Sequence, residues 1–195
     1  MQAWTNLGAL LRDSGALSEA QVALQEAVRR SPNDRTVLCN LAALHVLLGH
    51  AAPATARAAF DRALAYDSTN ADALYNLGVL EATHQNFERA IFFYQTCVRV
   101  QPRHTLAWNN LGVVYQQVEN IPCALECYEA AVGSKPNFWL ALNNLGVLYT
   151  AQGHSGKAER HLRAAIAANS KYAEAYNNMG VLLRDRGLVA EVRSI

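Results

Sequence analysis

The sequence shows no excess of either charge, because 17 lysines and arginines stand against 16 aspartates and glutamates. No stretch is rich in basic residues, so the electrostatic footprint expected of a nucleic-acid-binding protein is missing. No run approaches the roughly 18 apolar residues of a membrane-spanning helix, and the first residues, MQAWTNLGALLRDSG, lack the basic start and apolar core of a secretory signal. These absences predict a soluble intracellular protein, with no nucleic acid and no membrane among its partners.

Cysteine is scarce and irregularly spaced, since the chain has only Cys39, Cys97, Cys123 and Cys127. Without an export signal, this pattern fits reduced thiols better than a disulfide framework. Cys123 and Cys127 stand four residues apart on an expected helix, but no further Cys or His pair nearby would complete a tetrahedral metal site. We therefore expect no metal.

Motifs of catalysis are also missing from the sequence. It has no glycine-rich phosphate loop that follows a strand, no nucleophile elbow, and no paired acid and base with a credible pocket. We therefore expect no cofactor, no catalytic residue and no enzyme activity from this chain alone.

The sequence does contain an internal repeat in which Asn precedes Leu or Met and then a small residue. The asparagines are separated by 34, 36, 34, 34 and 34 residues, and they are Asn6, Asn40, Asn76, Asn110, Asn144 and Asn178. A period of about 34 residues is the signature of the tetratricopeptide helix–turn–helix. The repeats run over 1–34, 35–70, 71–104, 105–138, 139–172 and 173–195, the last being incomplete. We predict an all-α fold, in which residues 1–195 form a single right-handed superhelical solenoid of antiparallel helix pairs.

Positions four, seven, eight and eleven of the first helices trace an apolar stripe, which Tyr115 and Tyr149 close at position eleven in the fourth and fifth repeats. Position eight is small throughout: Gly8, Ala42, Gly78, Gly112, Gly146 and Gly180. The matching place on the second helix is also small, and it is held by Ala20, Ala56, Ala90, Ala124 and Ala158, while the large contacts of that helix are Leu24, Phe60, Tyr94, Tyr128 and Leu162. A small residue at this place lets the two helix backbones come close.

Proline and glycine mark the expected helix ends. Pro32, Pro102 and Pro136 should stop the second helices of their repeats, because proline cannot donate the next backbone hydrogen bond. Gly15, Gly49, Gly153 and Gly187 can take a left-handed conformation after the first helix, and Asn86 and Asn120 stand one position later in the third and fourth repeats. Two extra residues before Pro53 should lengthen a surface turn, with Pro53 early in a second helix.

The sixth repeat ends before its second helix is complete. We expect Tyr176, Met179 and Leu183 to be poorly covered as a result. Because the ends of solenoids normally need polar capping helices, we also expect the chain to be part of a longer array.

A second stripe, at positions two, five, six, nine and thirteen of the first helices, should line the inner curve of the solenoid. Position six is always Asn, and position five is Asn109, Asn143 and Asn177 in the last three repeats. An Asn side chain presents one acceptor and two donors, which complement a peptide bond. A ladder of such side chains could hold an extended segment of a client protein by its main chain, so we predict peptide binding by Asn6, Asn40, Asn76, Asn110, Asn144 and Asn178 together with Asn109, Asn143 and Asn177.

The same amides have a second interpretation, which the sequence leaves open. An Asn at position six could instead hydrogen-bond to the neighbouring helix pair and fix the stacking of the repeats. The doubled asparagines of the last three repeats favour binding there.

Three runs of sequence carry a more specific resemblance: ADALYNLGVLEATHQNFERAIFFYQTCVRVQP, ALECYEAAVGSKPNFWLALNNLGVLYTAQG and YAEAYNNMGVLLRDRG. They are similar to the repeat region of the SPINDLY family, relatives of the O-linked N-acetylglucosamine transferase. The resemblance implies a solenoid that captures client proteins on its Asn ladder and presents Ser or Thr to a glycosyltransferase domain absent here. The ladder of that family matches Asn76, Asn110, Asn144 and Asn178 best. The alternative is a non-catalytic tetratricopeptide adaptor that scaffolds a protein complex, and homodimerisation through the convex face also stays open.

Overall fold

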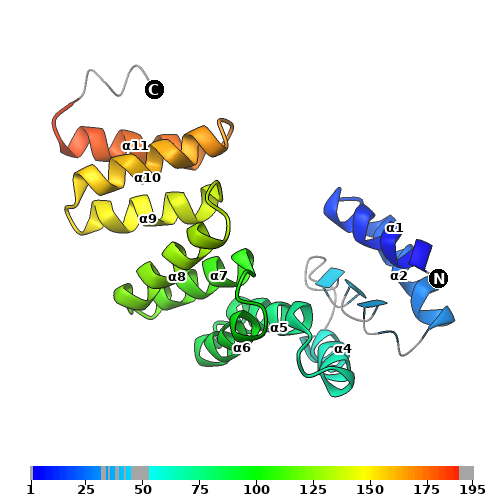
Figure 1. Cartoon of the computed structure of the whole chain (residues 1–195). Helices are drawn as coiled ribbons and strands as arrows, with labels where there is room; N and C mark the ends of the chain where they lie inside the picture. Colours follow the sequence, from blue (N-terminus) through cyan, green and yellow to red (C-terminus); the bar gives the residue numbers. More distant parts are fainter. Residues whose placement is uncertain are drawn as a thin grey trace. The chain divides into compact units, whose positions relative to one another are not determined.

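The computed structural model describes residues 2–31, 34, 36–37, 40–41, 43–44 and 53–188. These residues form helices and, within the described ranges, no strand (Figure 1). The helices are α1 (Gln2–Asp13), α2 (Leu17–Arg30), α4 (Pro53–Tyr66), α5 (Ala71–Thr83), α6 (Phe87–Val100), α7 (Thr105–Gln117), α8 (Ile121–Ser134), α9 (Trp139–Ala151), α10 (Ser155–Ala168) and α11 (Ala173–Asp185). None of the helices in these ranges is long and apolar enough to cross a membrane.

The chain divides into two compact units, Met1–Pro102 and Arg103–Ile195, and each is described by itself. The division falls in the loop between the third and fourth predicted repeats. Within the units the helices pair as the repeat requires, α1 with α2, α5 with α6, α7 with α8 and α9 with α10 (Figure 1). Continuity of all six repeats in a single solenoid stays a prediction.

Close contact between the two helices of a repeat depends on the glycine at position eight. A Cβ atom added to Gly78 would lie 2.5 Å from Cε1 of Tyr94, and one added to Gly112 would lie 2.6 Å from the same atom of Tyr128. These separations are too short for any side chain, so the predicted role of a small residue is confirmed at both positions. Ala42, at the same position of the second repeat, lies outside the described residues.

The large residues of the second helices form the core, as predicted. They are 0–1% exposed, and they are Leu24, Phe60, Tyr94, Tyr128 and Leu162. In the second unit one cluster of buried side chains joins α8, α9, α10 and α11. This shared core holds the first helices of successive repeats in a fixed relation, which matters for the side chains on their other face.

The helix ends mostly follow the predicted punctuation. α6 and α8 end two residues before Pro102 and Pro136, and α4 begins at Pro53. Pro32 lies outside the described residues, although α2 ends at Arg30, two positions before it.

The left-handed turns between the helices follow the prediction in part. Gly15, Gly153 and Gly187 have φ values of 83°, 74° and 74°, as expected, whereas Gly49 lies outside the described residues. In the other two described turns the left-handed residues are Gln85 (φ 61°) and Glu119 (φ 59°), which hold the position of the glycines and directly precede Asn86 and Asn120. Asn120 starts the next helix by accepting a hydrogen bond from the backbone N–H of Cys123.

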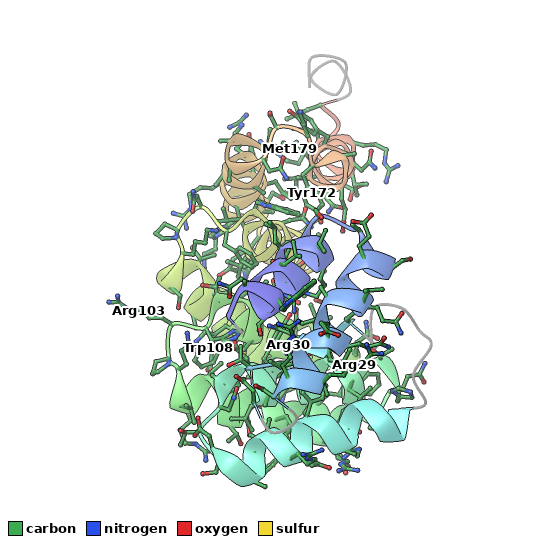
Figure 2. The ribbon with its side chains drawn as sticks, turned by 90° about the vertical axis from the view of Figure 1, so that its right-hand side faces the viewer. Arg29, Arg30, Arg103, Trp108, Tyr172 and Met179 are labelled. Carbon is green, nitrogen blue, oxygen red and sulfur yellow. The ribbon has the colours of Figure 1, made fainter. Side chains whose placement is uncertain are left out.

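The sixth repeat is better covered than the sequence suggested. Met179 and Leu183 of α11 are 3% and 2% exposed, because they pack into the core shared with α9 and α10 (Figure 2). The expectation of poor coverage is therefore wrong for these two residues, while Tyr176 is partly exposed.

Candidate peptide-binding face

The position-six asparagines of the second unit are Asn110 on α7, Asn144 on α9 and Asn178 on α11, and all three are partly exposed. The residues four before and three after each asparagine share its face of the helix, and they are aliphatic except for Glu174 of α11. Among these, Leu106, Val113 and Val181 are 44%, 38% and 40% exposed. We call this the amide face, and its members are Leu106, Asn110, Val113 and Gln117 on α7, Leu140, Asn144, Val147 and Ala151 on α9, and Glu174, Asn178, Val181 and Asp185 on α11.

Charge is confined to one end of the amide face. Its only ionisable side chains are Glu174 and Asp185, both on α11. The parts on α7 and α9 are therefore amide and aliphatic, which suits an uncharged ligand.

The position-five asparagines lie elsewhere. The sequence placed them on the same open stripe as position six, but in the structure Asn109 and Asn143 are only 5% and 0% exposed. Asn177 of α11 is exposed. Asn109 and Asn143 thus have no surface to offer a ligand directly, and any part they play in binding must be indirect.

Hydrogen bonds link the two positions across successive repeats. Nδ2 of Asn144 donates to Oδ1 of Asn109 over 3.2 Å, and Nδ2 of Asn178 donates to Oδ1 of Asn143 over 2.9 Å. We call these two bonds the amide relay. Nδ2 of Asn109 donates in turn to Oδ1 of Asn110 over 3.3 Å.

The relay agrees with the second interpretation of the position-six asparagines, in which they fix the stacking of the repeats, because it joins α9 to α7 and α11 to α9. It uses one N–H of each position-six side chain, and a carboxamide has a second N–H and an oxygen with two lone pairs. Fixing the stacking and holding a peptide are therefore compatible for Asn144 and Asn178. Peptide binding itself stays a prediction.

One donor of this network has no partner. Nδ2 of Asn143 is buried and makes no hydrogen bond among the described residues. Such a group typically costs about 1–3 kcal/mol of stability. Hydrophobic packing alone would not retain an amide here, so the acceptor function of Asn143 in the relay gives a reason for its presence.

Among the described residues of the first unit, no equivalent relay is found. Nδ2 of Asn76 donates to the backbone oxygen of Asp72 within its own helix, over 2.8 Å. Oδ1 of Asn40 accepts from Nη1 of Arg12 over 3.2 Å, and Asn6 is exposed. The sequence explains the difference, since position five of the second repeat is Cys39, which lies outside the described residues and lacks a carboxamide.

A buried ionic cluster in the first unit was not anticipated from the sequence. Glu81 of α5 is 1% exposed and forms ion pairs with Arg57 of α4 and with Arg89 of α6, the latter over 3.5 Å from Nε. Nδ2 of Asn86 also donates to its Oε2 over 2.9 Å. The signal was present, because Glu81 occupies position eleven of the otherwise apolar stripe, where the next repeat has Tyr115. Since the carboxylate is enclosed and compensated, we assign the cluster to structure.

Thiol chemistry is disfavoured at two of the cysteines. Burial raises the pKa of Cys97 and of Cys127 to about 12, so neither thiol is ionised near neutral pH. Sγ of Cys97 also donates to the backbone oxygen of Ala71 over 3.3 Å. Across the ranges that the structure describes, no three His, Cys, Asp or Glu side chains gather in a way that could hold a metal ion.

Stacked helix pairs with a repeating polar position on one face define the class of helical-repeat solenoid proteins. Comparison with protein-family models gives the particular family: models described as tetratricopeptide repeat match residues 2–34, 41–98, 106–138 and 140–169. The chain belongs to the tetratricopeptide repeat family, and the predicted all-α solenoid of helix pairs is confirmed.

Solved structures show the same fold. The chain is similar to PilF of Pseudomonas aeruginosa, with 21% identity over 98% of this chain and 87% of that one and a TM-score of 0.85. It also resembles MamA (25% identity, 86% and 96% covered, TM-score 0.67) and YrrB (22% identity, 89% of each chain covered, TM-score 0.62). A search of curated protein sequences found no significant match.

Proposed function

We propose that this tetratricopeptide repeat protein is a binding scaffold whose amide face holds an extended segment of a partner protein. The observation that carries the proposal is the amide relay, which orients Asn144 and Asn178 on adjoining first helices. Both side chains stay partly exposed, next to exposed aliphatic residues.

The chemistry of the face favours recognition of the main chain. The spare N–H and the oxygen of each position-six carboxamide match the C=O and N–H of a peptide bond. Each such hydrogen bond contributes only about 0.5–1.5 kcal/mol net, so useful affinity requires several repeats to act together. Val113 and Val181 would contact apolar or small side chains of the bound segment.

A related structure offers a precedent. YrrB is described as a tetratricopeptide repeat protein with an unusual peptide-binding site. At 22% identity the similarity concerns the fold, so the precedent supports binding of a peptide in general and does not identify the residues that bind.

We further propose that the chain is the repeat region of a larger SPINDLY-like protein, because its sequence resembles that family. In that case the amide face would recognise substrates of a protein O-glycosyltransferase of the nucleus and cytoplasm, and a separate domain would transfer fucose or N-acetylglucosamine to Ser or Thr. This proposal rests on the three runs of sequence that resemble the family. The second candidate is a non-catalytic adaptor, which the membership in the tetratricopeptide repeat family favours.

Peptide binding is tested with a fluorescein-labelled, end-capped twelve-residue peptide rich in Ser and Thr, measured by fluorescence anisotropy. We expect the wild type to bind it and the variant N110A/N144A/N178A to bind at least about tenfold more weakly, because three main-chain contacts are lost. Glu126→Gln, an exposed change on α8, is the control, and circular dichroism verifies the helicity of each protein. Equal affinity of the wild type and the triple variant, or no binding by either, would contradict the proposal.

The proposal of a larger SPINDLY-like protein is tested by sequencing the transcript beyond the codon of Ile195. A glycosyltransferase domain in the same reading frame supports the transferase proposal. A stop codon directly after Ile195 supports the adaptor.

A further inference from the structure

We infer that Asn109 and Asn143 are positioning residues of the peptide site, which act on a bound segment through the position-six asparagines to which they are hydrogen-bonded. This inference rests on the proposed function. Because Asn109 and Asn143 are 5% and 0% exposed, direct contact with a peptide is ruled out for both. Their influence passes through the two relay hydrogen bonds and, for Asn109, also through its hydrogen bond to Asn110.

The relay restricts the side chains that it holds. A surface Asn on a helix can rotate about two side-chain bonds, and its amide end has no fixed direction. When one N–H is bonded to the preceding repeat, rotation stops and the second N–H and the oxygen take a defined orientation. A peptide then binds without first ordering these side chains, which is the general benefit of preorganisation.

Comparison with the first unit shows what happens without a position-five partner. Asn76 also stands at position six, but its Nδ2 turns back to the carbonyl oxygen of Asp72, one turn earlier in α5. This donor is used within its own helix and not in a hydrogen bond to the preceding repeat. The binding segment should therefore lie across α7, α9 and α11 and should gain little from α5.

The partner that fits this arrangement is an extended main chain with uncharged side chains. Each relay-held carboxamide offers both a donor and an acceptor, as a peptide bond does. The neighbouring Val113 and Val181 are more than a third exposed, and the parts of the face on α7 and α9 carry no charge. A strongly acidic or basic segment would find no partner there.

A double-mutant cycle between Asn109 and Asn144 tests the inference, with the capped Ser/Thr-rich peptide as probe. Asn109→Leu keeps the branched shape of the side chain and removes the acceptor, and we expect it to raise Kd roughly two- to tenfold, the range of one hydrogen bond. In the Asn144→Ala background the same change should have a much smaller effect on Kd, because the relay bond is already gone and only the bond from Asn109 to Asn110 is left to lose. An equal effect in both backgrounds, or no effect in either, overturns the inference.

The design separates failure of the inference from failure of the proposed function. If Asn144→Ala does not weaken binding, peptide recognition by the amide face is refuted. If Asn144→Ala weakens binding but Asn109→Leu does not, only the positioning role is refuted. Ser134→Ala, which removes a hydrogen bond to the backbone of Ala130 on α8, serves as the matched control for loss of one hydrogen bond.

A measurement on the wild type covers the case in which Asn109→Leu does not fold. Nuclear magnetic resonance of protein labelled with 15N at asparagine reports the exchange of side-chain amide protons with solvent. The amides of Asn144 and Asn178 should exchange several-fold more slowly than that of the exposed Asn177, because only the former donate within the relay. Equal rates for all three would overturn the inference.

Discussion

Replacement of Gly112 by alanine tests the packing of the repeat most directly. The new Cβ would lie 2.6 Å from Cε1, 2.8 Å from Cδ1 and 3.0 Å from Cζ of Tyr128. The ring is 0% exposed, and its hydroxyl donates to Oε1 of Gln116 over 3.1 Å, so it cannot swing into solvent. Either α7 and α8 must separate or the ring must leave its place in the core.

Two opposing effects set the magnitude for Gly112→Ala. Overpacking of a core costs typically about 1–3 kcal/mol, and contact with rigid ring atoms places this site at the upper end. Alanine gains about 1 kcal/mol over glycine as a helix former. We therefore expect a net loss of about 2 kcal/mol in the free energy of unfolding.

Urea unfolding followed by circular dichroism measures the change, and Gly133→Ala provides the matched control. Gly133 lies in α8, with nothing within 4 Å of an added Cβ, so alanine should stabilise the protein there by about 0.5–1 kcal/mol. If Gly112→Ala proves as stable as the wild type, or shifts in the same direction as Gly133→Ala, the close-contact argument is refuted.

Three further predictions concern other sites. Arg57→Met should lower the free energy of unfolding by about 3 kcal/mol, because the buried Glu81 loses a charge partner. Arg89→Met, at a side chain that is 58% exposed, should lower it by less than about 1 kcal/mol. Urea unfolding of the two variants measures the difference. Burial, and to a lesser extent the charge of Arg160, lowers the pKa of His161 below its ordinary value of 6.5. The folded state therefore binds fewer protons than the unfolded state, and the free energy of unfolding should fall as the pH drops below about 6.5. Thermal melts of His161→Gln should show a weaker dependence on pH in that range. Gln85→Gly should stabilise the protein by about 1 kcal/mol because glycine adopts φ 61° without strain, and an unchanged or lower melting temperature would contradict this.

Much of the fold was predictable because packing leaves a regular trace in the sequence. A small residue at position eight and a large one on the second helix recur at a fixed period, and among the described residues the structure brings four such pairs into contact: Gly8 with Leu24, Gly78 with Tyr94, Gly112 with Tyr128 and Gly146 with Leu162. Helix ends next to proline were predictable as well, because the missing N–H of proline limits the helix locally, whatever the rest of the fold.

The candidate site was less predictable, because the sequence does not show which side of a helix is covered by the next repeat. Asn109 and Asn110 are adjacent and of the same type, yet one is buried and the other partly exposed. Similarly, Glu81 interrupts an apolar stripe, and its compensation by Arg57 depends on a helix from the preceding repeat. Contacts between side chains of different repeats, unlike contacts within one repeat, can be identified only from the structure.

The direction of the amide relay has a consequence for how such a chain can grow. Each link joins the fifth position of one repeat to the sixth position of the next, so a single copied module that carries both asparagines supplies the acceptor for its successor and the donor for its predecessor. Tandem duplication of residues 139–172 would therefore lengthen the row of oriented amides without any further mutation. Under the proposed function, an array that began with one asparagine pair could come to bind a longer peptide segment by gene duplication alone.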